Sequence, residues 1–270
     1  MLTTTHKPGS AFLTFTRNGS DTVVTRSFAT SPVKLITTRG RGSTCWVYAA
    51  TFGGGLVGGD EIRLRADVAT GARALLTTQA STKVYRSSRQ SRQSLDAAVA
   101  ADAMLTVVPD PIVCFADANF VQTQRYELHD RSTLIMVDWM TSGRHAAGER
   151  WAFSRYESRV DIRRGAERIF FDGLVLEPEL DSVAARMGHV EVLLTAVITG
   201  PLVADAAIDM VERVSQDPIR RGSNLVASAA RLRDGGALLR MAGVSVELVG
   251  GELRRWLTFL PPDDFWNRKW

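Results

Sequence analysis

Alternation of apolar and polar residues dominates the first two thirds of the chain. From residue 61 to 68 apolar side chains alternate with charged ones, and this period of two predicts a half-buried β-strand. β-Branched and aromatic residues, which favour further strands, are also frequent in residues 45–52, 133–140 and 160–176. We place turns at Arg164-Gly165 and Asp172-Gly173, where glycine interrupts the apolar pattern.

Two segments near the C-terminus change to a helical period. Apolar residues recur every three or four positions in residues 203–214 and again in 246–260, which predicts two α-helices. Between them, residues 225–232 and 237–241 flank an Asp-Gly-Gly turn and form a predicted hairpin. Neither a low-complexity linker nor an internal repeat divides the sequence. We therefore expect residues 1–270 to form a single domain that is mainly β, with two α-helices in its C-terminal third.

The composition is that of an ordinary globular protein, with 45% hydrophobic and 23% charged residues among 270. The net charge of +4 is mildly basic, and its clearest cluster is Lys83, Arg86, Arg89 and Arg92, a run with no acid inside it. Such a run is either a solvated strand end or a surface that attracts an acidic protein. Few aromatic residues lie nearby to stack on bases, so we expect no nucleic-acid partner.

Signals for secretion and membrane insertion are missing from the sequence. Residues 1–8 lack the apolar core of a signal peptide, and the longest apolar tract, residues 190–198, is too short to span a bilayer. We therefore expect a cytoplasmic protein that makes no contact with a membrane. Cys45 and Cys114 are expected to be reduced and buried in that compartment. Because the chain has no C-x-x-C pair, we expect no closed zinc site.

A glycine cluster at residues 53–60 has the sequence Gly-Gly-Gly-Leu-Val-Gly-Gly-Asp. It contains the spacing G-x-G-x-x-G, but a dinucleotide-binding fingerprint opens a helix and a strand is predicted to follow here. It also contains the glycine spacing of a phosphate-binding loop, but Asp60 stands where that loop has its lysine. We interpret most of these glycines as a turn that needs positive φ angles and close backbone contact.

The order of residues in this turn resembles the signature of the UreD (UreH) family of urease accessory proteins. The first matching block includes Gly54, Gly55, Gly58, Gly59 and Asp60. A second block follows at the expected distance and includes residues 71–78 and then Thr82, Lys83, Tyr85 and Arg86. The next blocks are matched by residues 109–115, 142–144 and 148–149. The resemblance extends from Thr51 to Glu177.

The resemblance implies a fold, a role and a set of partners. The family fold is a β-helix-like arrangement of many strands in stacked sheets, with a pair of helices. Its members are not enzymes: they bind UreF, which recruits the GTPase UreG, and the assembly docks on apo-urease. Nickel released by UreG is proposed to pass through the interior of UreF and UreD to the urease active site, where a lysine is carbamylated and two nickel ions are bound. The resemblance implies no tightly bound cofactor, only transient Ni²⁺.

Isolated carboxylates that line a wet interior suit a passage for Ni²⁺, because they hold the ion without trapping it. Asp138 and Asp172 lie among apolar residues, where a carboxylate needs a partner or water. Each is expected to form a salt bridge, for example to Arg144 or Arg159, to turn outward, or to face such a passage. The candidate passage residues are Asp60, Thr82, Lys83, Asp138, Glu149 and Asp172.

Two rival functions fit parts of the sequence. A β-helix-type carbohydrate-active hydrolase would use paired carboxylates such as Asp60 and Glu149 for acid–base catalysis. A basic β protein that binds nucleic acid would use the arginine-rich run that starts at Lys83. Neither rival explains why two family blocks stand in register between residues 54 and 87. We therefore rank the accessory role first and predict no catalytic residues.

Overall fold

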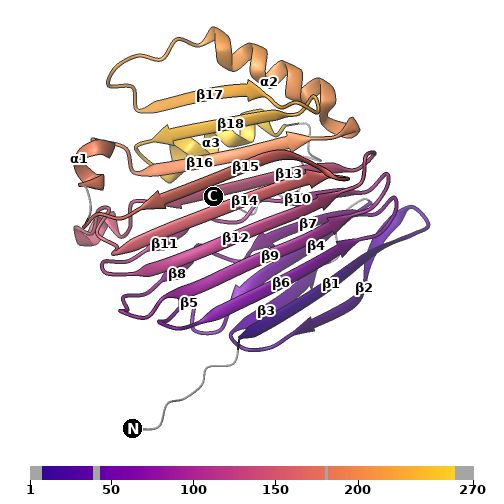
Figure 1. The fold of residues 1–270 in the computed structure, drawn as a ribbon, viewed down its shortest axis with the longest axis horizontal. Coiled ribbons are helices and arrows are strands. Elements are labelled where there is room, and N and C mark those ends of the chain that lie inside the picture. The colour runs from indigo at the N-terminus through magenta and orange to yellow at the C-terminus, as the bar shows by residue number, and fades with distance from the viewer. Residues whose placement is uncertain (1–7, 39–42, 180–181, 259–270) are drawn as a thin grey trace.

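The computed structural model describes residues 8–38, 43–179 and 182–258. Most of them belong to two stacked β-sheets, which we call sheet A and sheet B (Figure 1). Sheet A has the strand order β15 (Glu167–Leu176), β14 (Arg155–Arg164), β12 (Asn119–Leu128), β9 (Ser91–Val99), β6 (Glu61–Val68), β1 (Gly9–Asn18) and β2 (Asp21–Ala29). The main path of sheet B is β17 (Leu225–Arg231), β18 (Ala237–Gly243), β16 (Val192–Thr199), β13 (Thr133–Thr141), β10 (Met104–Val107), β7 (Arg73–Thr78), β4 (Thr44–Thr51) and β3 (Val33–Thr38).

The chain passes back and forth between the two sheets in the middle of the molecule. It runs from β6 in sheet A to β7 in sheet B, then to β9, β10, β12, β13 and β14. Neighbouring strands are therefore parallel there, as in β6–β9–β12 and β4–β7–β10–β13. Two parallel strands that are adjacent in a sheet need a crossover connection between them. Here that connection runs through a strand of the opposite sheet. The predicted mainly β fold is confirmed, and its β-helix-like character belongs to this middle part, because antiparallel hairpins such as β1–β2 and β14–β15 lie at its ends.

The two turns predicted within residues 160–176 have different outcomes. The first is confirmed, because β14 and β15 form an antiparallel hairpin that turns at Gly165. The second is wrong: Asp172 and Gly173 lie inside β15, opposite Val160 and Arg159. The flanking Phe170 and Leu174 pack against the core between the sheets, and this packing overrides the turn preference of Asp-Gly.

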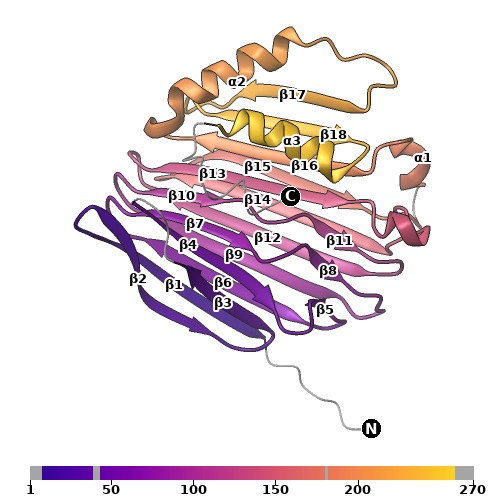
Figure 2. The same ribbon diagram turned by 180° about the vertical axis from the view of Figure 1, so that it is seen from behind.

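Both predicted helices are present, on the outer face of sheet B (Figure 2). They are α2 (Ala204–Gln216) and α3 (Val246–Trp256), whose apolar faces pack over β16 and β18. The Ser245 hydroxyl accepts a hydrogen bond from the Leu248 N–H and caps the start of α3. The structure adds a short helix, α1 (Val183–Met187), which has too few residues to produce a periodic pattern. Two single 3₁₀ turns are η1 (His145–Ala147) and η2 (Pro201–Val203).

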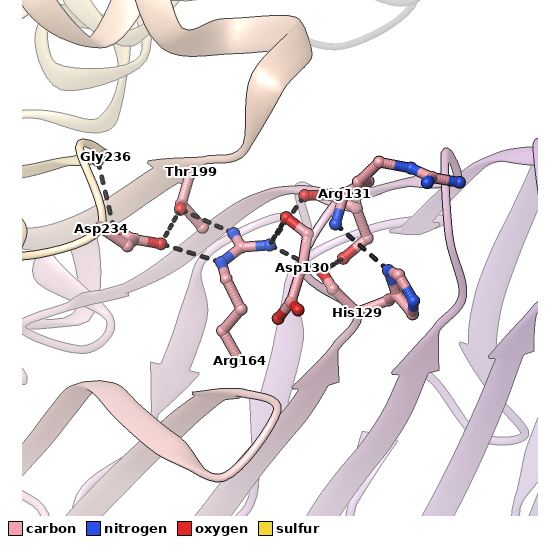
Figure 3. A network of polar contacts seen from close by, with 8 residues as sticks. His129, Asp130, Arg131, Arg164, Thr199, Asp234 and Gly236 are labelled. Carbon is pink, nitrogen blue, oxygen red and sulfur yellow. Dashed lines mark hydrogen bonds and ion pairs between the residues drawn. The ribbon is translucent and has the colours of Figure 1, made fainter.

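A largely buried ion pair joins sheet A to sheet B at one edge (Figure 3). Arg164, at the end of β14, donates from Nε to the Asp234 carboxylate over 3.2 Å, and the two side chains are 12% and 11% exposed. The same guanidinium donates to Thr199 Oγ1 at 3.0 Å and to the backbone carbonyls of His129 and Ser132. Because Asp234 lies in the β17–β18 turn, this network fixes the β14–β15 hairpin relative to the β17–β18 hairpin.

Candidate functional site

Several segments that carry the family-like blocks come together at one end of the molecule. Three short strands, β5 (Gly55–Leu56), β8 (Thr82–Val84) and β11 (Ile112–Cys114), pair side by side, and β11 pairs with the end of β13 (Figure 1). Just beyond β13, the Arg144 guanidinium lies 4.3 Å from the centre of the Phe115 ring. Blocks that are far apart in the sequence are therefore neighbours in the fold.

The glycines of the first block have two different physical roles. Gly54 and Gly59 have φ angles of +73° and +89°, which favour glycine over residues with a side chain. Gly55 and Gly58 instead lack room: a Cβ on Gly58 would stand 2.4 Å from Ser87 Cβ. Asp60 closes the turn, because its carboxylate accepts a 2.9 Å hydrogen bond from the Val57 N–H. The block is thus a turn with positive φ angles and close contacts, as the sequence predicted, and the structure shows that it packs against Lys83, Tyr85 and Ser87.

The charged and aromatic residues of the later blocks make several contacts at this end of the molecule. Tyr85 packs edge-on against Phe115 with ring centres 5.1 Å apart, and Arg86 forms a 2.9 Å ion pair with Asp117. Glu149 accepts hydrogen bonds from Arg144 Nε at 2.9 Å and from the backbone N–H of Ala116 at 3.0 Å. The hydrogen bond from Arg144 has the largest part in lowering the pKa of the Glu149 carboxyl, and the bond from the Ala116 N–H has the next largest. Lys83 is exposed at the surface of β8, as are the arginines that follow it.

A first cavity, of about 160 Å³, lies between the two sheets. Its walls come from β6, β9 and β12 on one side and from β4, β7, β10 and β13 on the other. Polar side chains in the walls include Thr78, Thr82, Asp110, Gln122 and Asp138. Exposed residues, among them Gly54 and Gln79, also line it, so the cavity reaches the surface beside the glycine turn.

A second cavity, of about 400 Å³, adjoins the first. It lies between β13, β16, β17 and β18 of sheet B and the β14–β15 hairpin of sheet A. Asp172, Ser228 and Arg240 line it, and the exposure of the last two shows that it opens to the surface at the far side from the glycine turn. Asp138 and Trp139 belong to the walls of both cavities. The two cavities therefore meet at Asp138.

Asp138 is held by neutral hydrogen-bond donors. Gln122 Nε2 donates to one carboxylate oxygen over 2.6 Å, and Ser158 Oγ donates to the other over 2.5 Å. Burial raises the pKa of the Asp138 carboxyl; these two hydrogen bonds oppose the shift, and the charge of Asp172 adds to it. Burial and the charge of Asp138 also raise the pKa of the nearby Tyr156 hydroxyl. The arrangement favours a cation beside Asp138, because a cation would offset the penalty of burying a negative charge.

The salt bridges named for Asp138 from the sequence are wrong. Arg144 pairs with Glu149 and Arg159 with Glu157, both away from Asp138. Asp138 shares the inward face of β13 with Leu134 and Met136, so it does not turn outward either. Asp172 does form a salt bridge, but with Arg240, whose guanidinium nitrogen lies 2.8 Å from Asp172 Oδ1.

The structure thus brings together three of the six passage candidates. Thr82, Asp138 and Asp172 line the two cavities. Asp60 closes a local turn, Glu149 accepts hydrogen bonds from Arg144 and the Ala116 N–H, and Lys83 is exposed. The rival hydrolase gains no support, because Asp60 and Glu149 are each held separately and line neither cavity. Sequence reasoning missed the residues that complete the cavity walls: Gln122, Gln124, Ser158 and Arg240. The first two were recognisable, because they occupy inward positions of β12 where an apolar residue is usual.

No stable metal site is evident in residues 8–38, 43–179 and 182–258, which contain no group of three or more His, Cys, Asp or Glu arranged around one point. Cys45 and Cys114 are buried and free, as predicted, and burial raises the pKa of both thiols. None of the helices in these segments has the length and apolar character needed to cross a bilayer.

Comparison with known proteins identifies the family. The family model described as UreD urease accessory protein matches residues 7–264. The urease accessory protein UreD of Sorangium cellulosum is 48% identical over 267 residues, covering 98% of this chain and 85% of the relative. That of Anaeromyxobacter sp. is 41% identical over 94% of this chain and 86% of the relative. The urease accessory protein D of Arabidopsis thaliana is 38% identical over 63% of this chain and 59% of the relative.

The family match and these relatives therefore identify the chain as an accessory protein of urease. The chain belongs to the UreD family.

Proposed function

We propose that this chain is a urease maturation scaffold that passes Ni²⁺ toward apo-urease and catalyses no reaction itself. It binds UreF and, through UreF, the GTPase UreG, and the assembly docks on apo-urease. Membership of a urease accessory family supports the role in urease maturation. The observation that carries the nickel path is the meeting of two surface-reaching cavities at Asp138.

The chemistry of the cavity walls fits an ion that moves on. One carboxylate with neutral hydrogen-bond donors attracts a divalent cation but supplies too few ligands to retain it. A compact set of His and Cys ligands would trap Ni²⁺ at the same place. Thr82 lies toward the glycine turn and Asp172 toward the far opening, so oxygen atoms stand on both sides of Asp138. We assign these three residues to the path, and the protein to the cytoplasm.

The test replaces Asp138 with Ala in a urease-positive host that lacks its own copy of the gene. Nickel bound per urease and urease activity are measured after copurification of the accessory complex. We expect the variant to fold, to copurify with UreF, and to leave urease with at least a few-fold less nickel. The matched control is Asp96→Ala, which removes an exposed carboxylate paired with Arg125 on sheet A, and it should load nickel normally.

Two outcomes would contradict the proposal. Unchanged nickel loading with Asp138→Ala would remove the cavity path. Full urease activity in the host that lacks the gene would remove the maturation role altogether.

A further inference from the structure

A row of polar side chains crosses the inner face of sheet B, over four strands that lie side by side (Figure 1). The row is Asp138 of β13, Thr195 of β16, Arg240 of β18 and Ser228 of β17, each directly opposite the next. Residues that stand opposite one another in neighbouring strands point to the same face of the sheet, and all four line the second cavity. The row therefore runs from the meeting point of the two cavities to the far opening.

Arg240 is the one positively charged side chain among the residues that line either cavity, within the part of the chain that the structure describes. Its guanidinium nitrogen lies 2.8 Å from Asp172 Oδ1. Asp172 reaches this point from sheet A, on the inward face of β15 opposite Val160. A guanidinium bound to a carboxylate competes with any other cation for the same oxygen atoms. A cation that leaves Asp138 for the far opening therefore meets a carboxylate that already holds a positive charge.

Without Arg240, the second cavity would present two carboxylates with no positive charge beside them. Asp138 and Asp172 both line it. Burial is the main cause of the raised pKa of the Asp138 carboxyl, and the charge of Asp172 adds to it, so the two groups act on each other electrostatically. Carboxylate oxygens are ligands for divalent metal ions, and two such groups hold an ion more firmly than one. The positive charge of Arg240 opposes this retention.

The Asp172–Arg240 ion pair is exposed enough to open. Its side chains are 27% and 51% exposed, whereas those of the Arg164–Asp234 pair are 11–12% exposed. An ion pair that is partly in water is weak, because water solvates both groups when they separate. A divalent cation can therefore displace the Arg240 guanidinium from Asp172, and the guanidinium can return.

We propose that Arg240 is a built-in counter-ion that competes with Ni²⁺ for Asp172 and thereby prevents the path from retaining the ion. This inference rests on the proposed function. When the guanidinium turns into solvent, Asp172 takes the ion from Asp138. When the guanidinium returns to Asp172, it restores the ion pair and releases Ni²⁺ at the far opening.

The first test measures the affinity of the purified chain for Ni²⁺ by calorimetry. Arg240→Met keeps most of the length of the side chain and removes its charge, so the variant should bind Ni²⁺ roughly tenfold more tightly than the unmodified chain. Arg240→Lys keeps the charge and should bind as weakly as the unmodified chain. Adding Asp172→Asn to Arg240→Met should abolish the gain, because the second carboxylate is then missing.

The matched control is Arg168→Met. Arg168 pairs with Asp161 at 2.9 Å on the β14–β15 hairpin, and the two side chains are 47% and 21% exposed, close to the values for Arg240 and Asp172. Neither lines a cavity, so this variant should leave the affinity for Ni²⁺ unchanged. Circular dichroism checks that each variant folds, and Arg240→Gln replaces Arg240→Met if the latter does not.

The second test follows delivery of the metal. An accessory complex that contains Arg240→Met should load urease with nickel at least a few-fold more slowly and should retain nickel after purification. A normal loading rate despite tighter binding would overturn the inference, because retention would then not limit delivery.

The remaining contrary outcomes separate this inference from the proposed function. An unchanged affinity in Arg240→Met, together with loss of nickel loading in Asp138→Ala, would overturn the inference alone, and the ion pair would only connect the two sheets. An equal gain in Arg240→Lys would also overturn it, because the charge would not be the cause. Unchanged nickel loading in Asp138→Ala would overturn both.

Discussion

The ion pair between Arg164 and Asp234 should be among the larger polar contributions to the stability of this fold. Asp234→Ala removes the carboxylate and leaves a guanidinium that is only 12% exposed. Breaking a buried ion pair from one side destabilises proteins by about 3–5 kcal/mol. Arg164 keeps its bonds to Thr199 and to backbone carbonyls, so we take the lower end, about 3 kcal/mol. For a domain of this size that corresponds to a fall in melting temperature of roughly 6 °C or more.

The assay is urea unfolding followed by tryptophan fluorescence, with a double-mutant cycle. Arg164→Met, Asp234→Ala and the double variant are compared with the unmodified chain. Because the two side chains share one network, the double variant should be at least about 1.5 kcal/mol more stable than the sum of the single changes predicts. Arg131→Ala is the control: Arg131 makes a bidentate pair with Asp102, but both side chains are more than half exposed, so no measurable shift is expected.

Two results would refute the reasoning. One is an Asp234→Ala variant that unfolds at the same urea concentration as Arg131→Ala. The other is additivity of the Arg164 and Asp234 changes within about 0.5 kcal/mol, which would mean that the pair acts as two independent surface groups.

Three further predictions follow from other parts of the structure. Because the folded pKa of Asp138 is raised above 3.8, the free energy of unfolding should fall as pH rises from that value through the folded pKa. In urea unfolding, the free energy of unfolding of Asp138→Asn minus that of the unmodified chain should therefore be larger at pH 7.5 than at pH 4.5. The same difference at both pH values would contradict this prediction. Gly58→Ala should lower the melting temperature through its clash with Ser87, and Ser87→Gly should restore part of the loss, whereas no rescue would place the strain elsewhere. Cys45 and Cys114 should react with iodoacetamide at pH 8 only after unfolding in urea, and rapid reaction of the folded chain would show that they are not buried.

Local pattern was sufficient to predict some of the strands, among them β4, β6 and β13, and both long helices. The alternation in residues 61–68 became β6, and the helical period at 203–214 became α2. It failed at Asp172-Gly173, because turn preference is local whereas the packing of β15 depends on neighbours far away in the sequence. The five residues of α1 offered no period to detect.

The candidate site was only partly predictable for the same reason. The sequence singled out Asp138 because a carboxylate in an apolar strand needs an explanation, and the structure places it between two cavities. Its partners Gln122 and Ser158 come from β12 and β14 of the opposite sheet, and no local pattern pairs them with β13. Asp60 and Glu149 were also candidates in the sequence, but the Asp60 carboxylate closes a local turn and the Glu149 carboxylate accepts hydrogen bonds from Arg144 and the Ala116 N–H.

The winding of the chain between the sheets has a consequence for how the molecule is made. Arg73 pairs with Met104 and Met104 with Thr133, so each turn of the coil adds its strand to one completed a turn earlier. A chain emerging from the ribosome can therefore add each strand to the sheets in order, before its C-terminal part has been synthesised. At each stage the last strand added has an unpaired edge that can bind neighbouring nascent chains. Slow synthesis or truncation within this region should therefore favour aggregation.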